Sequence, residues 1–200
     1  MSDDGIRIQR PLPGLLVADG LFAGVADEFR AAVEAVPLEI QRVGLARVDG
    51  LPERRSRGTT TEPSIPALLW PLLEPVLPPL PEWFDAGETP QLDPPVTSWR
   101  AVGCNPMTRV YRYSLGERFA PHVDRPWRPT PARRSFLTVL VYLPSGAPCL
   151  GGETVVYGTA VTCTDWRCVT FDHRLLHEGR PIEKGEKLVV RSDVVYEAGL

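Results

Sequence analysis

Hydrophobic and polar residues alternate over short segments in the second half of the chain. From about residue 100, segments rich in Val, Thr, Tyr and Phe are separated by Gly, Pro or polar turns. These segments are TRVYRYSL, SFLTVLVYLP, ETVVYG, RCVTFD and KLVVRSDVVYE. Short strands separated by turn residues are typical of an antiparallel sandwich or barrel. The pattern therefore predicts a β half over residues 100–200.

The first half shows a different period. Apolar residues recur at three- and four-residue steps over residues 20–36, which predicts an amphipathic helix with Asp19 as its N-cap. A second helix is predicted over residues 64–77, with Ser64 near its cap and with Pro71 and Pro75 kinking or breaking it. The polar segment 51–62, LPERRSRGTTTE, is predicted to be a loop.

These elements predict an α+β protein that is mainly β. No domain-boundary linker separates the two halves, so residues 1–200 are expected to form a single domain. Residues 1–99 would be a helical and Pro-rich part, with many of the 22 prolines between residues 63 and 95. The helices are expected to pack against the outside of one sheet, and residues 100–200 to form the β core.

Charge and composition exclude some classes of function. The chain has 22 basic and 25 acidic residues, a net charge of −3, and gives no overall attraction to nucleic acid or to an anionic membrane. We find no apolar run long enough to span a bilayer, and the start, MSDDGIRIQR, is polar with no apolar signal core. The four cysteines lack zinc-type spacing. We expect reduced thiols in a cytoplasmic protein, and the oligomeric state stays open.

The candidate chemistry begins with the tripeptide HVD. Residues two apart on a strand point the same way, so His122 and Asp124 can chelate one ion, and His177 lies downstream in the β half. Two histidines and one carboxylate form the facial triad of non-heme iron(II) sites. An HxD pair alone is equally typical of a polar surface strand.

Neighbouring features favour the metal site over the surface strand. GGET at 151–154 is a Gly-Gly turn into a strand, and HEG at 177–179 ends a strand at a tight turn. Lys187 and Arg191 share one face of a later strand, where either cation could bind a dicarboxylate. RVYRY, just before the HxD pair, places tyrosine hydroxyls near the same pocket.

Taken in order, these motifs resemble a known family. RVYRYSLGERFAPHVD, SFLTVLVYLP, GGETVVY and VTFDHRLLHEGRPIEKGEKLVVRSDVVYE, over residues 105–197, look like the iron(II)- and 2-oxoglutarate-dependent oxygenases of the prolyl-4-hydroxylase-like branch. The resemblance implies a double-stranded β-helix, or jelly roll, with His122, Asp124 and His177 as iron ligands. It implies iron(II), 2-oxoglutarate and dioxygen as cofactor and cosubstrates, with ascorbate as an optional reductant. It implies no catalytic residue beyond the metal centre.

The resemblance also assigns the cosubstrate pocket. The far carboxylate of 2-oxoglutarate would meet Lys187, or Arg191 in the manner of related branches, and we rank Lys187 first. Tyr113 and Tyr142 match tyrosines that line this pocket in relatives, and Thr138 lies on the same face as Tyr142. The sequence departs from the family at the edge of the pocket: GTAVTCTDWRCVTFDH lacks the usual Pro-Gly turn, and Val156 stands where an aromatic residue is common.

The implied reaction is hydroxylation of a C–H bond with release of succinate and carbon dioxide. The small size favours a small molecule, such as an amino acid or metabolite, or a short peptide; the alternative within this chemistry is a peptidyl or protein prolyl hydroxylase. A non-catalytic, cupin-like module that binds a metal or ligand is the alternative from another class. Candidate substrate-contacting residues, each equally open to a structural role, are Arg125, Trp127, Arg128, Asn105 and Arg109. His173 is expected either to support a ligand of the site or simply to be a polar residue at a strand end, rather than to bind the metal.

Overall fold

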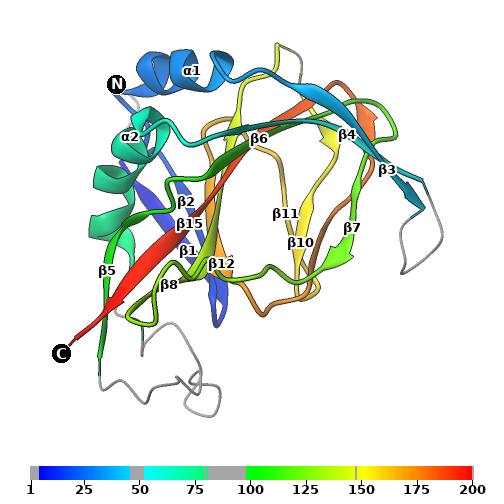
Figure 1. Ribbon diagram of the computed structural model, residues 1–200. Helices are drawn as coiled ribbons and strands as arrows, with labels where there is room; N and C mark the ends of the chain where they lie inside the picture. Colours follow the sequence, from blue (N-terminus) through cyan, green and yellow to red (C-terminus); the bar gives the residue numbers. More distant parts are fainter. Residues whose placement is uncertain (1–4, 46–51, 79, 81–97, 147, 200) are drawn as a thin grey trace.

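The protein is built mainly of antiparallel β-sheet (Figure 1). The computed structural model describes residues 5–45, 52–78, 80, 98–146 and 148–199. Within these residues, the larger sheet follows the order β1-β2-β12-β8-β15-β6-β4-β3, and β5 pairs with β15 beside this path. Its strands are β1 (Arg7–Leu12), β2 (Leu15–Asp19), β3 (Glu39–Leu45), β4 (Pro52–Thr60), β5 (Trp99–Cys104), β6 (Thr108–Tyr113), β8 (Arg133–Leu143), β12 (Cys168–Asp172) and β15 (Lys187–Ala198).

A smaller sheet follows the order β11-β10-β13-β7, and β9 and β14 form a separate pair. The strands of these two groups are β7 (Phe119–His122), β10 (Thr154–Val156), β11 (Thr159–Val161), β13 (His177–Gly179), β9 (Leu150–Gly151) and β14 (Ile182–Lys184). All the pairs within the sheets are antiparallel, as the pattern of short strands and turns predicts.

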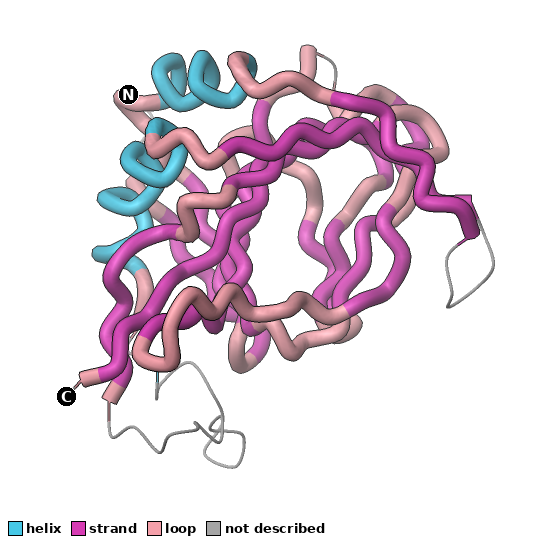
Figure 2. The backbone as a smooth tube through the Cα atoms, in the orientation of Figure 1, coloured by secondary structure: helices cyan, strands magenta, loops and turns pink. Residues whose placement is uncertain are grey.

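The chain winds alternately through the two sheets (Figure 2). β6, β8, β12 and β15 lie in the larger sheet, and β7, β10, β11 and β13 lie between them in sequence but in the smaller sheet. This alternation makes a double-stranded β-helix, so the predicted jelly roll with flanking helices is confirmed. The five segments from which the β half was predicted correspond to β6, β8, β10, β12 and β15.

The inner layer between the sheets is where the site is built. Successive strand residues point to opposite faces, so Lys187, Val189 and Arg191 face the smaller sheet while Leu188 and Val190 face outward. The apolar residues of the inner layer form one buried cluster, and the outward residues form another. The strand that carries both candidate cations is therefore held from both sides.

Both predicted helices exist and cover the outer face of the larger sheet (Figure 1). α1 (Ala26–Glu34) and α2 (Ser64–Leu73), which is followed by a 3-10 turn at Glu74–Val76, bury Phe29 and Leu69 against that sheet. The ring of Phe29 meets Phe22 edge-on at 4.9 Å between centroids. The expectation that the helices pack outside one sheet is confirmed.

The helix termini differ from the prediction. α1 begins at Ala26, and Asp19 does not cap it but ends β2 and pairs bidentately with Arg167 at 2.8 and 2.9 Å. Gly20 and Gly24, both at positive φ, make the turns that delay the helix. Pro71 lies inside α2 without breaking it. It lies on the exposed side, where water can satisfy the carbonyl that its missing N–H leaves free.

The first half of the chain also supplies strands that the sequence did not reveal. The segment 51–62, predicted to be a loop, contains β4, which joins the larger sheet between β3 and β6. Residues 1–99 are therefore not only helical and Pro-rich: β1 to β4 extend the sheet at both edges. β4 has no apolar alternation, because its inward residues, Glu53, Arg55 and Arg57, are charged. The single-domain organisation stays a prediction.

Much of the Pro-rich segment, including Trp83, lies outside the described residues. Among the helices that the structure describes, none combines the length and the apolar character needed to cross a membrane. The four cysteines are free thiols.

The packing of α1 leads to a prediction. Replacing Phe29, which is fully buried, with Ala leaves a cavity beneath the helix, and should lower the free energy of unfolding by about 3–5 kcal/mol. Urea unfolding measures this change. The exposed neighbour Glu28→Gln should change it by less than about 0.5 kcal/mol. Equal effects of the two substitutions would show that α1 does not pack as described.

Candidate metal centre and its pocket

The three candidate metal ligands come together at the end of the smaller sheet. His122 is the last residue of β7, and His177 is the first of β13, directly opposite it in the strand register. Two expectations are corrected here. Asp124 lies in the loop after β7 rather than on the strand, and HEG forms β13 rather than ending a strand.

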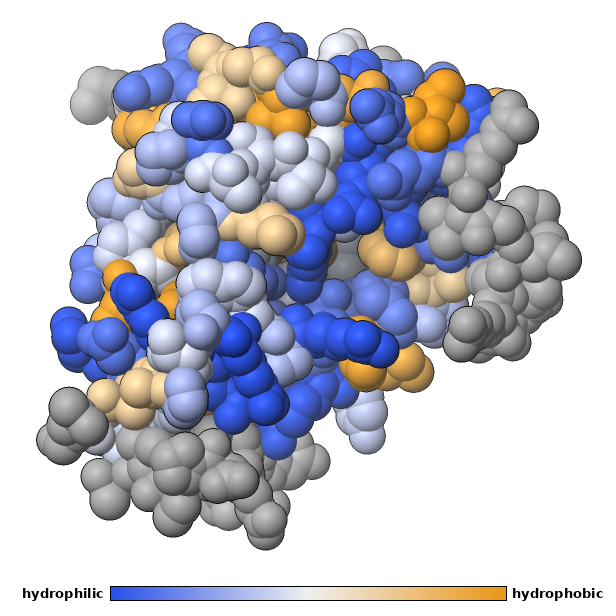
Figure 3. Space-filling model, in the orientation of Figure 1, coloured by the Kyte–Doolittle hydropathy of each residue, from blue (hydrophilic) through white to orange (hydrophobic). Residues whose placement is uncertain are grey.

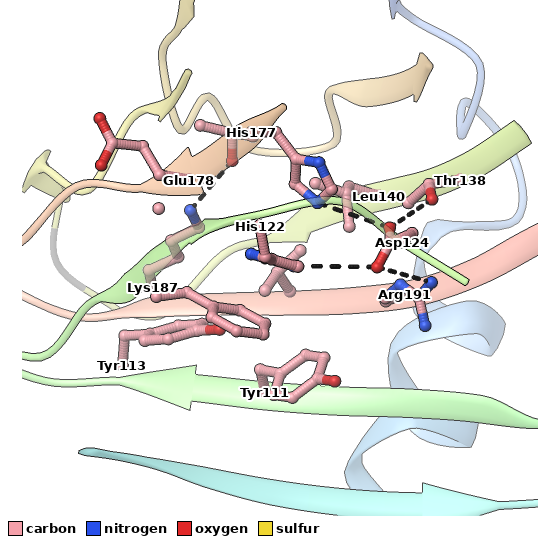
Figure 4. A pocket seen from close by; sticks show the side chains of 14 residues that line it. Tyr111, Tyr113, His122, Asp124, Thr138, Leu140, His177, Glu178, Lys187 and Arg191 are labelled. Atoms are coloured by element: carbon pink, nitrogen blue, oxygen red, sulfur yellow. Dashed lines mark hydrogen bonds and ion pairs between the residues drawn. The ribbon is translucent and has the colours of Figure 1, made fainter. Parts of the chain in front are cut away.

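The ligand atoms converge on one point (Figure 4). One ligand atom from each of His122, Asp124 and His177 lies within 4.8 Å of the others. The Asp124 carboxylate is 3.8 Å from His122 Nε2 and 3.4 Å from His177 Nε2. A two-histidine, one-carboxylate group of this kind can hold a divalent transition metal with open positions on one side.

The two histidine rings are each oriented by the backbone carbonyl two residues earlier in the chain. His122 Nδ1 lies 2.8 Å from the Ala120 carbonyl, and His177 Nδ1 lies 2.9 Å from the Leu175 carbonyl. Because a carbonyl only accepts, each Nδ1 carries the proton and each Nε2 presents a lone pair to the centre. Burial lowers the pKa of His177 to about 4 and also lowers the pKa of His122, so both rings are neutral at neutral pH. The donor set therefore fits a metal.

Asp124 is held as a carboxylate by its neighbours. Arg191 Nη2 donates to Oδ1 at 3.0 Å and the Thr138 hydroxyl donates to Oδ2 at 2.5 Å. Burial alone would raise the pKa of Asp124, but the charge of Arg191, together with the Thr138 hydrogen bond, keeps it low, at about 2. The carboxylate is thus ionised and fixed in orientation before any metal arrives.

A chain of hydrogen bonds supports Asp124 from behind. Because Thr138 donates its only proton to Asp124, it accepts from His173 Nδ1 at 2.9 Å. His173 Nε2 then accepts from the Ser135 hydroxyl at 2.8 Å, and Ser135 Oγ accepts from the Trp127 N–H at 2.8 Å. His173 therefore supports the candidate ligand Asp124 and is not itself one of the three converging groups.

Lys187 is a buried cation at the other end of the same cavity (Figure 4). It is only 5% exposed, and burial lowers its pKa. Nζ donates to the Gly152 carbonyl at 2.7 Å and to Thr154 Oγ1 at 3.3 Å. Within the described part of the chain, no carboxylate lies in ion-pair contact with it. A buried ammonium without a counter-ion is costly, which marks this end of the cavity as an anion site.

Arg191 differs from Lys187 in having its charge already matched. Its Nη2 contacts Asp124 at 3.0 Å and Asp193 at 3.2 Å. The two cations share a face of β15, as their spacing predicts, but only Lys187 is uncompensated.

The predicted cosubstrate residues fall in two layers. Tyr113 and Thr138 line the cavity. Tyr142 lies behind it, 2% exposed, and donates its hydroxyl to Thr154 at 2.7 Å. The rings of Tyr113 and Tyr142 lie 5.6 and 5.2 Å from Lys187 Nζ, where their faces favour a cation.

The GGET turn is fitted to Lys187 by its glycines. Gly151 and Gly152 both have positive φ, and a Cβ on Gly151 would lie 2.6 Å from the backbone carbonyl oxygen of Pro181. Glycine at these positions lets the turn present the Gly152 carbonyl to Lys187 without strain.

The substrate candidates border a second, more open space. A groove of about 450 Å³ begins at His122 and Asp124 and extends between β4, β6, β15 and the loop after β7. Asn105, Arg109, Arg125 and Trp127 line it, whereas Arg128 is exposed outside its lining. Asn105 also donates to Asp193 at 2.7 Å.

Several residues of the site were missed from the sequence. Phe119 stacks on His122 at 4.0 Å between ring centroids, and Phe171 lies 4.6 Å from His177. Arg55 and Arg57 of β4, which were also missed, line the groove, whereas Tyr111, from the RVYRY motif that was expected near the pocket, lines both spaces. Arg55 and Arg57 alternate with Arg54 and Ser56, and this two-residue period was the signal that could have placed the two arginines on one face of a strand. It was not recognised because the segment was predicted to be a loop.

Comparison with solved structures supports the fold. An oxidoreductase of the 2OG-Fe(II) oxygenase family from Burkholderia pseudomallei is 15% identical, with a TM-score of 0.57 over 92% of this chain and 85% of that one. The viral collagen prolyl hydroxylase of Paramecium Bursaria Chlorella virus-1, solved as a 2OG complex, is 15% identical, with a TM-score of 0.50 over 92% and 96%. Neither protein-family models nor curated proteins match the sequence. The resemblance seen in the sequence is thus confirmed at the level of the fold.

The support of Asp124 by Thr138 leads to a prediction. Thr138→Val keeps the shape of the side chain but removes the hydroxyl, so Asp124 loses a hydrogen bond and His173 is left with an unpaired N–H. Affinity for Mn(II), measured by competition with a chelator, should fall about 10–100-fold. Thr138→Ser keeps the hydroxyl and should stay close to the unsubstituted protein. If the Val and Ser variants bind Mn(II) equally, the hydroxyl does not orient Asp124.

Proposed function

We propose that this protein is an iron(II)- and 2-oxoglutarate-dependent dioxygenase. It hydroxylates a C–H bond of a small molecule or short peptide, converting 2-oxoglutarate and dioxygen to succinate and carbon dioxide. The observation that carries the proposal is the pairing of two sites in one cavity. A His-Asp-His group lies at one end and a buried, uncompensated lysine lies at the other.

The metal ligands would be His122, Asp124 and His177, whose neutral rings and ionised carboxylate suit iron(II). When bound, iron supplies the redox chemistry that places one oxygen atom of dioxygen in succinate and the other in the product. The protein's part is to fix the ligands. Thr138 and Arg191 orient Asp124, and the carbonyls of Ala120 and Leu175 orient the two rings.

Lys187 would bind the far carboxylate of 2-oxoglutarate. That carboxylate would supply the counter-ion that Lys187 lacks, in a pocket walled by Tyr113 and Thr154. Arg191 is the weaker candidate because Asp124 and Asp193 already neutralise it. We assign it to holding Asp124.

The apolar residues around the cavity would exclude water from the reacting groups. Phe119 and Phe171 cover the two histidine rings, and Leu140 and Val189 floor the space between Lys187 and the ligands. Exclusion of water strengthens the charged contacts and protects reactive species from side reactions. A non-catalytic metal-binding module would have no need of a buried lysine at this place.

The first test is anaerobic absorption spectroscopy. Adding 2-oxoglutarate to the protein with iron(II) should produce the visible charge-transfer band of a chelated 2-oxo acid. His177→Ala should abolish the band, because it removes a ligand. No band in the unsubstituted protein, or the same band in His177→Ala, would contradict the proposal and favour the non-catalytic alternative.

The second test ranks the two cations. Lys187→Met should weaken 2-oxoglutarate binding by about 10–100-fold, the worth of a charged hydrogen bond, while Mn(II) affinity is retained. Arg191→Met should mainly weaken Mn(II) binding, since it releases Asp124. Titration of each ligand by calorimetry measures both effects. The reverse pattern would assign the carboxylate to Arg191.

A further inference from the structure

The groove beside the metal centre is lined by cations. It opens from His122 and Asp124, so a molecule bound in it would bring a C–H bond next to the metal. Figure 3 shows the molecule hollowed between the two sheets, with hydrophilic residues around the opening. The arginines that line the groove are Arg55, Arg57, Arg109, Arg125 and Arg191, and its acids are Asp124 and Asp193.

The sheet register explains why the arginines gather. Arg57 lies opposite Tyr111 in the β4–β6 pair, and Arg109 lies opposite Arg191 in the β6–β15 pair. Neighbouring strands thus place three guanidinium groups on the inner face of the sheet, near the mouth of the cavity. Like charges on adjacent strands repel, and such a row lowers the stability of the free protein.

Two of the five arginines are matched by acids within the protein. Arg55 Nη1 pairs with Glu53 at 2.6 Å and stacks over the Phe119 ring at 4.0 Å. Arg191 pairs with Asp124 and Asp193. Both acids of the groove, Asp124 and Asp193, are therefore already in ion pairs with Arg191.

The other three arginines have no such match. Among the described residues, no carboxylate lies within ion-pair distance of Arg57, Arg109 or Arg125. Arg57 Nε is buried without a hydrogen-bond partner, and the hydrogen bond that Arg109 makes through Nη2 goes to the Met107 sulfur at 3.4 Å. Burial, and then the charge of Arg191, lowers the pKa of Arg109. These charges would be stabilised by an anion that enters the groove.

We propose that the substrate is a small organic oxyanion, a carboxylate or phosphate ester, bound by Arg57 and Arg109 with Arg125 closing over it from the loop. The assignment rests on the proposed function and specifies its substrate class. Guanidinium forks bind carboxylates and phosphates bidentately. The groove volume of about 450 Å³ is that of a small-molecule site, and Tyr111 and Trp127 supply apolar walls for the carbon skeleton.

A series of probes of one shape and falling charge tests the proposal. N-acetyl-L-aspartate carries two negative charges, N-acetyl-L-asparagine one and N-acetyl-L-asparaginamide none. Their affinities are measured by ligand-observed NMR, with the protein metal-free and with Mn(II) and saturating 2-oxoglutarate. The affinity for the probe should fall about tenfold for each negative charge removed. Because Mn(II) is paramagnetic, it should also shorten the NMR relaxation time of a probe that binds beside it. Glycerol 3-phosphate, compared with glycerol, decides between phosphate and carboxylate.

Matched variants locate the site. Arg57→Gln and Arg109→Gln should each weaken binding of the dianion about tenfold and leave 2-oxoglutarate affinity unchanged, which also shows that the fold is intact. Arg54→Gln and Arg112→Gln are the controls. They lie on the same two strands, point away from the groove, and pair with Glu117 and Glu186. Both should bind the dianion as the unsubstituted protein does.

Three results would overturn the proposal: equal binding of the dianion and the neutral amide, no binding of either dianionic probe, or equal loss in the groove and control variants. Absence of a Mn(II) effect on a tightly bound probe would place the anion site away from the metal and would also overturn it. The metal-free titrations separate this outcome from failure of the proposed function. If the 2-oxo acid band did not appear, the proposed function would fail, but the affinity of the metal-free protein for the probes should still depend on their charge.

Discussion

The buried carboxylate of Asp124 is the group on which the rest of the site depends. It lies in a loop, so no strand fixes it, and its orientation comes from Arg191 and Thr138. These two residues come from β15 and β8 of the larger sheet, and the two histidines beside it come from β7 and β13 of the smaller sheet. The double-stranded β-helix brings the four residues together because the chain crosses repeatedly between the sheets. The candidate metal group is therefore a property of the whole winding and not of the HVD tripeptide.

Charge compensation divides the inner layer into three regions. Beside Asp124 the charge of Arg191 is matched by carboxylates of the protein, whereas Lys187 lacks a counter-ion at one end and Arg57, Arg109 and Arg125 lack one in the groove. Uncompensated cations lower stability unless a ligand neutralises them. The two unbalanced regions lie on either side of the metal ligands. This arrangement suits a reaction in which one anion is the cosubstrate and a second anion is the substrate.

Strands with their own alternation of apolar residues could be predicted from the sequence. Features that depend on how distant strands pair could not. Val-rich alternation identified β8 and β15, and the spacing of Lys187 and Arg191 placed them on one face. β4 could not be recognised, because its inward residues, Glu53, Arg55 and Arg57, are charged and no apolar alternation marks it; it becomes a strand by pairing with β6. The contact of Arg191 with Asp124 likewise requires the fold, since neither residue's neighbours indicate it. The difference in charge compensation between Lys187 and Arg191 followed only from these contacts.

The central claim is that one cavity holds a metal at the His-Asp-His group and a dicarboxylate between that metal and Lys187. Anomalous diffraction at the iron edge, from crystals grown anaerobically with iron(II) and 2-oxoglutarate, tests it most directly. We expect one iron peak bound by His122 Nε2, His177 Nε2 and the Asp124 carboxylate, with the far carboxylate of 2-oxoglutarate on Lys187 Nζ. No peak at these three residues, or a far carboxylate bound to Arg191 instead, would contradict it.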